Sequence, residues 1–315
     1  MNVGTSVHVV EVASFPPGYF LENFTVRTNG SILVTVLSHK QLWYIPPERG
    51  ELVEPVLLHT FDMMAMGIVE TERDVFYVAT GQPGRARLYR FDLRDWSPEL
   101  PVSPLVVIDL EESVGMVNGA CLVGPKTILI ADCFAGKIWR IDLEDNSMSA
   151  TAREWLRHDS MAHDPQGPMP DQPGVNGVRY AAKTNHIYYT NTAQQLFMRV
   201  AVDPHTLDPA GEPELVATGM MGDDFCIDEE KGIALVTTHR ENTVDRVSLT
   251  PDSNPGPRDS VLGNPVIDLM IGPTSAAWSR KPSEHGRVAY VTTDGGIKGP
   301  MPDGLRPAKV LRVTL

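Results

Sequence analysis

The stretch Ile138-Trp-Arg-Ile-Asp-Leu143 decides the fold, because versions of it recur along the whole chain. Each version has an apolar residue, a variable residue, usually Arg, and then alternating apolar positions. The other full versions are Leu88-Tyr-Arg-Phe-Asp-Leu93, Phe197-Met-Arg-Val-Ala-Val202, Val244-Asp-Arg-Val-Ser-Leu249 and Val310-Leu-Arg-Val-Thr-Leu315, and a degenerate version is Leu42-Trp-Tyr-Ile45. Six copies of one strand-like segment indicate a repeat architecture.

Two further segments precede each copy in the same order. The nearer is a short run rich in β-branched and aromatic residues, typical of a strand, at 32–37, 75–80, 127–132, 187–192, 234–239 and 288–293. The farther is an apolar segment that begins near Glu22, Gly67, Asn118, Asn176, Asp223 and Thr274, with spacings of 45, 51, 58, 47 and 51 residues. This period fits a four-stranded propeller blade.

The repeats predict a single all-β domain over residues 1–315, a six-bladed β-propeller whose blades each have four antiparallel strands. No helical period continues for several turns, and 26 Gly and 26 Pro punctuate the chain about as often as β-hairpins require. The last repeat ends at Leu315 and lacks an outer strand, which Ser6–Ala13 would supply. Such closure removes the exposed strand edges.

The composition excludes several classes of protein. Hydrophobic residues make up 42% and charged residues 21%, which is globular, and no apolar run approaches the roughly 18 residues of a membrane span. The formal charge of -13 repels a nucleic-acid backbone, so neither nucleic acid nor a membrane is an expected partner. The excess of carboxylates also suits cations, although a solvated acidic surface is the commoner reason for it.

The cysteines and the N-terminus bear on the compartment. Cys121, Cys133 and Cys226 have no CxxC spacing and form no disulfide framework, so we expect buried thiols. Residues 1–20 lack the charged start and unbroken apolar core of a signal peptide, so the chain is expected to be cytoplasmic as written. Two glycosylation sequons, at Asn23 and Asn29, keep open a secreted or endomembrane form from which a signal was removed.

The first strands of a propeller line its central channel, so residues that open these strands converge on one axis. In chain order they are Glu22, Met66-Gly67, Asn118, Asn176, Asp223-Asp224 and Thr274. A single Asn or Asp at a strand start is usually a turn or cap residue. Carboxylates and amides at the same repeat position would instead face each other, which is costly without a cation. We therefore expect Glu22, Asn118, Asn176 and Asp223 to bind one divalent metal, calcium or magnesium, with no organic cofactor.

The ends of the second strands should face the same mouth. They place His39, Thr80, Asp132 to Phe134, Thr192, His239 and Thr293-Asp294 there. His239 and His39 are candidate acid-base groups, because imidazole changes charge near neutral pH, and the alternative is a hydrogen-bonded loop histidine. Two long segments, 155–175 and 294–309, would overhang the site or be inert excursions.

Apolar residues near the axial positions suggest the nature of the ligand. Met66, Met116, Met220 and Met221 lie within three residues of axial positions, and Phe225 and Trp278 are close in sequence. Met adapts to varied apolar ligands, although core packing is the alternative for each one. We expect Met66, Met116, Met221, Phe225, Trp278, Phe134 and His39 to contact a large, apolar small-molecule substrate.

The set of Glu22, Asn118 in Val-Asn-Gly, Asn176 in Val-Asn-Gly-Val and Asp223 in Gly-Asp-Asp-Phe-Cys-Ile-Asp resembles the metal set of a known superfamily. This is the regucalcin/gluconolactonase, paraoxonase and diisopropyl fluorophosphatase superfamily, and the resemblance covers essentially the whole chain. It implies a six-bladed propeller with calcium or another divalent ion on the axis. It further implies lactone or phosphotriester hydrolysis with Asp223 as the metal-bound carboxylate. The second blade departs from the pattern, with Met63, Met64 and Met66 and no His to match the proposed paraoxonase base.

A narrower resemblance involves three segments. Ile271-Gly-Pro-Thr-Ser-Ala-Ala-Trp278, Val288-Ala-Tyr-Val-Thr-Thr-Asp-Gly-Gly296 and Asp223-Asp224-Phe225 are similar to a fungal branch of this superfamily found in natural-product pathways. Some members of that branch are hetero-Diels-Alderases, which join a reactive quinone methide to a terpene alkene. Such a reaction needs two apolar partners in near-attack geometry and donors on the developing oxygen charge.

Three functional hypotheses follow. The first is a pericyclase of the hetero-Diels-Alderase type in secondary metabolism, with His239 or Thr274 polarising a carbonyl. The second is a calcium-dependent lactonase or esterase in which the metal polarises the carbonyl and Asp223 activates water. The third is a non-catalytic propeller that binds a ligand or partner, with a metal that only rigidifies the axis.

Overall fold

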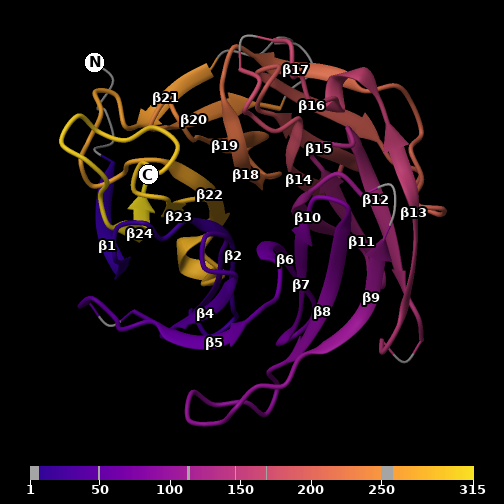
Figure 1. Cartoon of the computed structure of the whole chain (residues 1–315). Helices are drawn as coiled ribbons and strands as arrows, with labels where there is room; N and C mark the ends of the chain where they lie inside the picture. The colour runs from indigo at the N-terminus through magenta and orange to yellow at the C-terminus, as the bar shows by residue number, and fades with distance from the viewer. Residues whose placement is uncertain (1–6, 49, 112–113, 146, 168, 250–257) are drawn as a thin grey trace.

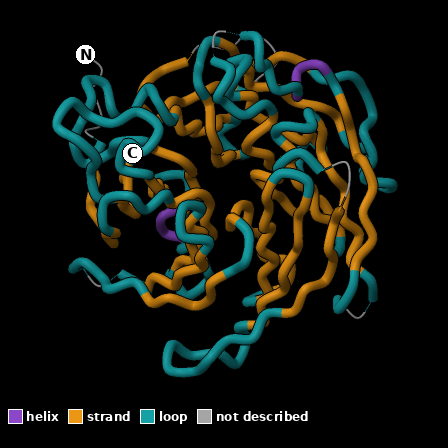
Figure 2. Tube along the Cα trace, in the orientation of Figure 1, coloured by secondary structure: helices purple, strands orange, loops and turns teal. Residues whose placement is uncertain are grey.

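Six four-stranded antiparallel sheets form a ring in the computed structural model of the chain (Figures 1 and 2). The structure describes residues 7–48, 50–111, 114–145, 147–167, 169–249 and 258–315. Within them, helix is limited to the two short turns η1 (Asp159–Met161) and η3 (Pro282–Glu284). The predicted all-β, six-bladed propeller is confirmed.

The strands follow the chain from the inside of each blade to its outside. Blade 1 holds β2 (Leu21–Val26), β3 (Ile32–Val36), β4 (Gln41–Ile45) and β5 (Val56–Thr60); blade 2 holds β6 (Met64–Glu72), β7 (Val75–Gln82), β8 (Arg85–Asp92) and β9 (Leu105–Glu111). Blade 3 holds β10 (Val117–Gly124), β11 (Thr127–Asp132), β12 (Lys137–Leu143) and β13 (Ala150–Arg157); blade 4 holds β14 (Val175–Ala181), β15 (His186–Asn191), β16 (Leu196–Ala201) and β17 (Glu214–Thr218). Blade 5 holds β18 (Gly222–Asp228), β19 (Ile233–Thr238), β20 (Thr243–Ser248) and β21 (Arg258–Leu262); blade 6 holds β22 (Pro273–Trp278), β23 (Val288–Thr293), β24 (Ala308–Thr314) and β1 (His8–Phe15).

The two ends of the chain meet in blade 6. β1 pairs antiparallel with β24, from His8 opposite Thr314 to Phe15 opposite Ala308. The outer strand predicted at Ser6–Ala13 is therefore found at His8–Phe15, and Ser6 lies outside the described residues. An ion pair of 2.9 Å between Lys309 Nζ and Glu11 adds to this closure.

A β-bulge interrupts the innermost strand of every blade at the same place. The pairing register shifts directly after Leu21, Ala65, Val117, Val175, Gly222 and Pro273. A bulge re-aims side chains, so in five blades the two successive residues after the shift both lie at the channel. They form an upper tier of Glu22, Met66, Asn118, Asn176 and Asp223 and a lower tier of Asn23, Gly67, Gly119, Gly177 and Asp224.

Threonines opposite three of the bulges join neighbouring blades. Thr190 Oγ1 on β15 accepts a hydrogen bond of 2.9 Å from Gly177 N–H and donates one of 2.5 Å to the Asp223 carbonyl of blade 5. Thr35 and Thr237 make the same pair of bonds in blades 1 and 5. Blades 2 and 3 carry Ala79 and Ala131 there. The hydroxyls thus satisfy backbone groups that the bulge takes out of the ladder.

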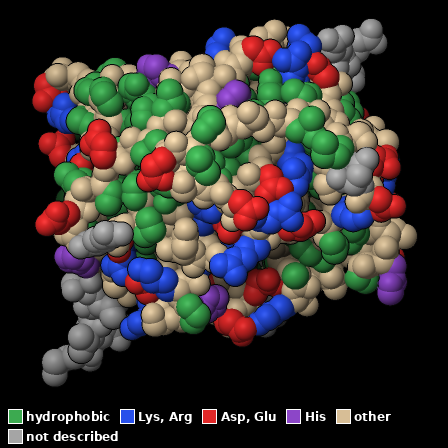
Figure 3. Space-filling view, turned by 90° about the horizontal axis from the view of Figure 1, so that it is seen from below, with side chains coloured by type: hydrophobic (Ala, Val, Ile, Leu, Met, Phe, Trp, Pro, Cys, Tyr) green, Lys and Arg blue, Asp and Glu red, His purple; other side chains and the backbone are tan. Residues whose placement is uncertain are grey.

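The hydrophobic core lies between the blades. Each of the clusters combines apolar residues of adjacent sheets, such as Tyr77 of blade 2 with Ile130 of blade 3. Figure 3 shows acidic and basic side chains intermixed over one side of the ring. Among the described residues, no helix has the length and apolar character needed to cross a membrane.

Candidate active site

A cavity of about 240 Å³ opens at one end of the channel. Its floor is polar and consists of Glu22, Asn118, Asn176 and Asp223. Its walls are mainly apolar and include Phe20, Leu37, Met64, Met66, Met116 and Phe134. Such a site can hold an apolar molecule and orient a polar group on it against the floor.

The floor brings together the four residues predicted as metal ligands. All four side chains are buried, with exposures of 3–5%. Asn176 Nδ2 donates to Asp223 Oδ1 at 2.6 Å and to Thr192 Oγ1 at 3.0 Å. Asn118 Oδ1 has no hydrogen-bond partner within the described part of the chain. A buried acceptor without a partner is costly and marks a place where a ligand would be bound favourably.

The electrostatics of the floor favour a cation. Burial, together with the nearby Asp224 and Asp294, raises the pKa of Glu22 to about 8. Burial and the charge of Glu22 raise the pKa of Asp223 well above its usual range. Both carboxylates would be more readily ionised beside a positive charge.

The donor chemistry of the floor fits a hard divalent ion. Two carboxylates and the free amide oxygen of Asn118 are the oxygen donors that calcium and magnesium prefer. Among the described residues there is no group of three or more His, Cys, Asp or Glu side chains that could hold a metal. Any ion here would therefore depend on the amide oxygens of Asn118 and Asn176 as well as on Glu22 and Asp223.

His239 lies at the side of the floor between two carboxylates. Its Nδ1 is 3.7 Å from Asp223 Oδ2, and its Nε2 is 3.0 Å from Asp294 Oδ2. Asp294 is fully buried, and its oxygens also accept hydrogen bonds from Gly296 N–H at 2.7 Å and Lys298 N–H at 3.2 Å. The fixed carboxylate can hold the imidazole with Nε2–H toward it, which leaves Nδ1 facing Asp223. His39 lies elsewhere, exposed and stacked on Tyr19 at 3.9 Å.

Three residues predicted to contact substrate line the cavity, namely Met66, Met116 and Phe134. Four do not: His39, described above, and Phe225, Met221 and Trp278. Phe225 is fully buried in the core and packs edge-on against Phe197. Met221 is outside the lining, and its N–H donates to Glu241. Trp278 lies at the far end of β22, beside Ser279 and Arg280.

Thr274 does not face the cavity either. Its hydroxyl donates to the Leu21 carbonyl at 2.6 Å and lies 2.9 Å from the hydroxyl of Thr292. It therefore joins blades 6 and 1, and its position does not support the predicted role in polarising a substrate carbonyl. Cavity residues with a side-chain donor include Asn118, Gln172 and Lys298, whereas both N–H groups of Asn176 are already used on Asp223 and Thr192.

Two loops and one thiol complete the cavity. Asp171, Gln172 and Pro173 come from the loop between β13 and β14, and Lys298 comes from the loop between β23 and β24. Both segments were expected from their length, and Lys298 was noted in the second of them, but Asp171, Gln172 and Pro173 were not singled out. Cys133 also lines the cavity, and burial raises the pKa of its thiol. The thiol is therefore protonated at neutral pH.

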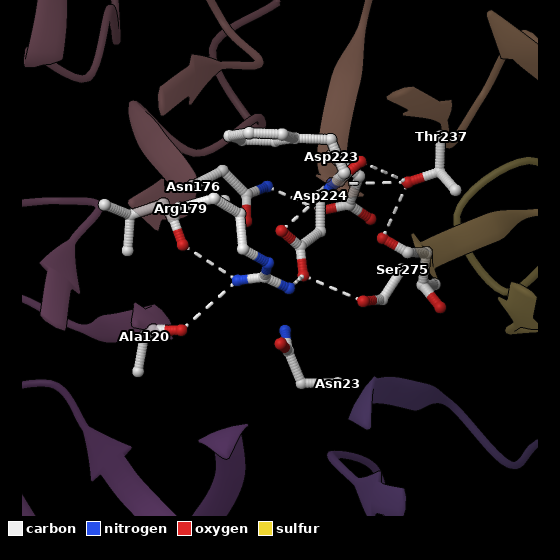
Figure 4. Close-up of polar contacts among 12 residues, drawn as sticks. Asn23, Ala120, Asn176, Arg179, Asp223, Asp224, Thr237 and Ser275 are labelled. Carbon is white, nitrogen blue, oxygen red and sulfur yellow. Dashed lines mark hydrogen bonds and ion pairs between the residues drawn. The ribbon is translucent and has the colours of Figure 1, made fainter. Parts of the chain in front are cut away.

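Beneath the floor lies a second polar group, of which the sequence predicted only the axial position of Asp224. Arg179 on β14 pairs with the buried Asp224 on β18 (Figure 4). Burial raises the pKa of Asp224, and the Arg179 guanidinium opposes that rise. Asp224 also accepts a hydrogen bond of 2.8 Å from Ser275 on β22.

Comparison with solved structures identifies proteins of the same fold. A luciferin-regenerating enzyme is 13% identical, with a TM-score of 0.67 over 98% of this chain and 96% of that one. The calcium-binding protein regucalcin from Agrobacterium tumefaciens is 16% identical, with a TM-score of 0.63 over 96% and 95% of the two chains. A gluconolactonase candidate is 12% identical, with a TM-score of 0.63 over 98% and 92%.

These similarities show the fold, a six-bladed propeller of the kind found in regucalcin and gluconolactonase-type proteins. No protein-family profile matches the chain, and no curated protein matches it either. A fold of this kind hosts many functions, and the chemistry of the cavity distinguishes them.

Proposed function

We propose that the protein is an enzyme that acts on a mainly apolar small molecule, and that its reaction is a hetero-Diels-Alder cycloaddition in secondary metabolism. The observation that carries this proposal is the pairing of a Met- and Phe-lined wall with a polar floor in one cavity. The wall would hold the hydrocarbon parts of the reactants, and the floor would bind the oxygen of a quinone methide.

The cycloaddition requires orientation more than acid-base chemistry. The oxygen and terminal carbon of the quinone methide bond to the two alkene carbons, and no atom is lost. Charge builds on the oxygen when the C–C bond forms ahead of the C–O bond. A donor such as Asn118 or Lys298 would stabilise that charge, and holding both partners in contact would lower the barrier further.

The floor would also hold one divalent cation, calcium by preference. Glu22, Asp223, Asn118 and Asn176 would be its protein ligands. A bound cation of this kind supplies positive charge that polarises a carbonyl oxygen. Proteins with the same fold include a luciferin-regenerating enzyme, the calcium-binding protein regucalcin and a gluconolactonase candidate. They support the proposal that this protein is a propeller enzyme with a divalent cation.

A second candidate function is favoured by the Asp223, His239 and Asp294 arrangement. An imidazole held by a buried carboxylate is a good general base, because its free nitrogen can take a proton from water. The cavity would then hydrolyse an apolar ester or lactone whose carbonyl lies on the floor.

The test uses purified protein, a quinone methide generated in solution, and a terpene alkene. The uncatalysed reaction gives a racemic dihydropyran, so we expect the protein to raise both the rate and the enantiomeric excess. Met116→Trp, which fills the cavity, should remove both effects, whereas Leu57→Trp on the exposed face of β5 should not. A racemic product at the uncatalysed rate would contradict the proposal.

Asp223→Ala separates the two candidates. It should abolish ester or lactone hydrolysis, because it removes the carboxylate beside His239. A cycloaddition driven by shape should persist within about tenfold, since orientation alone supplies much of the barrier reduction. A panel of aryl esters and lactones of increasing chain length is assayed in parallel, with a thermal melt to confirm that the variant is folded.

A further inference from the structure

The guanidinium of Arg179 occupies the channel directly beneath the candidate metal site. One of its nitrogens donates to the Ala120 carbonyl at 3.2 Å and another contacts Asp224 Oδ2. Asn23 of β2 points toward it from the opposite side in Figure 4. Oxygen-bearing groups of blades 1, 3 and 5 thus converge on a cation that the chain itself supplies.

The position of Arg179 determines how much charge the floor presents. Three buried carboxylates lie at the channel, Glu22 and Asp223 in the upper tier and Asp224 in the lower tier, each with an exposure of 5% or less. Arg179 pairs with Asp224. Among the described residues, Glu22 and Asp223 have no ion pair with an arginine or lysine, and the His239 beside Asp223 is itself held by Asp294. The two carboxylates of the floor match the charge of one divalent ion.

Without the guanidinium, the lower tier would itself be a set of hard oxygen donors. Asp224 Oδ2 would lose its charged partner, and the Ala120 carbonyl would lose a donor. Asn23 Oδ1 is buried and has no hydrogen-bond partner within the described residues even when Arg179 is in place. A carboxylate, an amide oxygen and a carbonyl are typical calcium ligands.

We propose that Arg179 is a specificity-determining residue that limits the channel to a single divalent ion. It does so by occupying, as a fixed cation, the place that a second ion would take beside Asp224. This inference rests on the proposed metal-binding function of the floor, and it concerns how many ions the protein holds rather than which reaction it performs.

The experiment counts ions per chain. Wild-type protein, Arg179→Ala and Arg179→Lys are dialysed against calcium, and bound metal and thermal stability are measured with and without a chelator. We expect Arg179→Ala to bind one ion more than the wild type and to gain a larger chelator-sensitive shift in melting temperature. Arg179→Lys keeps the charge and should retain the wild-type count. Arg199→Ala, which removes a mostly buried arginine of the same blade from its pair with Glu214, is the matched control.

The ion count of Arg179→Ala and the folding of a double variant decide whether the inference holds. A folded Arg179→Ala protein with the wild-type count would overturn it. If that variant folds poorly, Arg179→Ala with Asp224→Asn decides the matter: recovery of folding at the wild-type count supports the charge argument, and continued misfolding overturns it. If the wild type binds no ion and Arg179→Ala binds one, the metal site of the floor is refuted while Arg179 still keeps an ion out of the lower tier. No ion in either protein would refute both proposals.

Discussion

At the scale of single residues, the polar side chains of the cavity floor destabilise the empty protein, and a bound ligand would offset that cost. Glu22, Asp223 and Asn118 are buried next to each other with too few partners, and burial raises the pKa of both carboxyls. Groups in this state are typical of functional sites, since a protein selected only for stability would neutralise or pair them.

Glu22 makes the stability of the metal-free protein depend on pH. Its folded-state pKa of about 8 lies above the ordinary value of 4.5, so the folded state holds the proton more tightly than the unfolded state. Its contribution is therefore fully present below about pH 4.5 and is lost as the pH rises through about 8. In chelator, the melting temperature should fall across this window.

Glu22→Gln should flatten that fall, and Glu51→Gln, at an exposed carboxylate, should leave it unchanged. Saturating calcium should also flatten it, because the ion binds the ionised carboxylate. The same slope in wild type and Glu22→Gln would refute this explanation.

Asp294 should act on turnover through His239. Asp294→Asn replaces an acceptor by an amide that can present a donor to Nε2, so the imidazole loses its fixed orientation. If the enzyme hydrolyses lactones, turnover should drop by roughly 100-fold or more. Cycloaddition, which needs no base, should change by less than about tenfold. Equal losses in both assays would show that Asp294 serves only the fold, and the melting curve would show it as well.

At the scale of elements, the bulge in each inner strand sets what the channel can contain. It turns two successive residues inward, so the lower residue must be very small wherever a neighbouring blade comes close. Gly177 shows this, since a Cβ there would lie 2.5 Å from Asp224 Oδ1 and 2.8 Å from its Cα. The repeated Val-Asn-Gly of β10 and β14 is the sequence form of this arrangement.

Gly177→Ala should therefore destabilise the protein by about 1–3 kcal/mol, the usual range for overpacking. Gly211→Ala is the matched control, because nothing lies within 4 Å of the Cβ it would add. Urea unfolding measures both. Equal midpoints for the two variants would mean that the blades move apart to admit the methyl group.

The bulge also explains which parts of the site the sequence could predict. Glu22, Asn118, Asn176 and Asp223 occupy one repeat position, so a repeat count alone placed them around one axis, and the cavity confirms it. The prediction that Phe225 contacts the substrate was wrong because Phe225 follows the bulge. The regular alternation of the strand resumes there, and its side chain faces the core. Arg179 was missed because no other blade has a cation at its position.

At the scale of the whole molecule, the ring is held closed by one sheet made from both ends of the chain. Val12 of β1 is buried and belongs to the cluster that also contains Val310 of β24. Val10, two residues away in the same strand, is 38% exposed. The same substitution at these two positions, one buried and one exposed, therefore tests how much β1 contributes to closing the ring.

Val12→Asp should weaken the closure severely, by roughly 3 kcal/mol or more, because it buries an unpaired charge. Val10→Asp should cost much less, since its carboxylate reaches solvent. Thermal melts and limited proteolysis compare the two variants. Equal stability would mean that β1 contributes little to holding the ring.

Because β1 pairs with β24, the first strand must wait for its partner while the chain is being synthesised. Between Phe15 and Ala308 the chain adds nearly three hundred residues, so at roughly 5–20 residues per second β1 is exposed for roughly 15–60 seconds before its partner has been synthesised. During translation that strand has a free edge and a row of valines. The nascent chain is thus most open to chaperones, and to pairing with its neighbours on the same messenger RNA, until its last strand emerges.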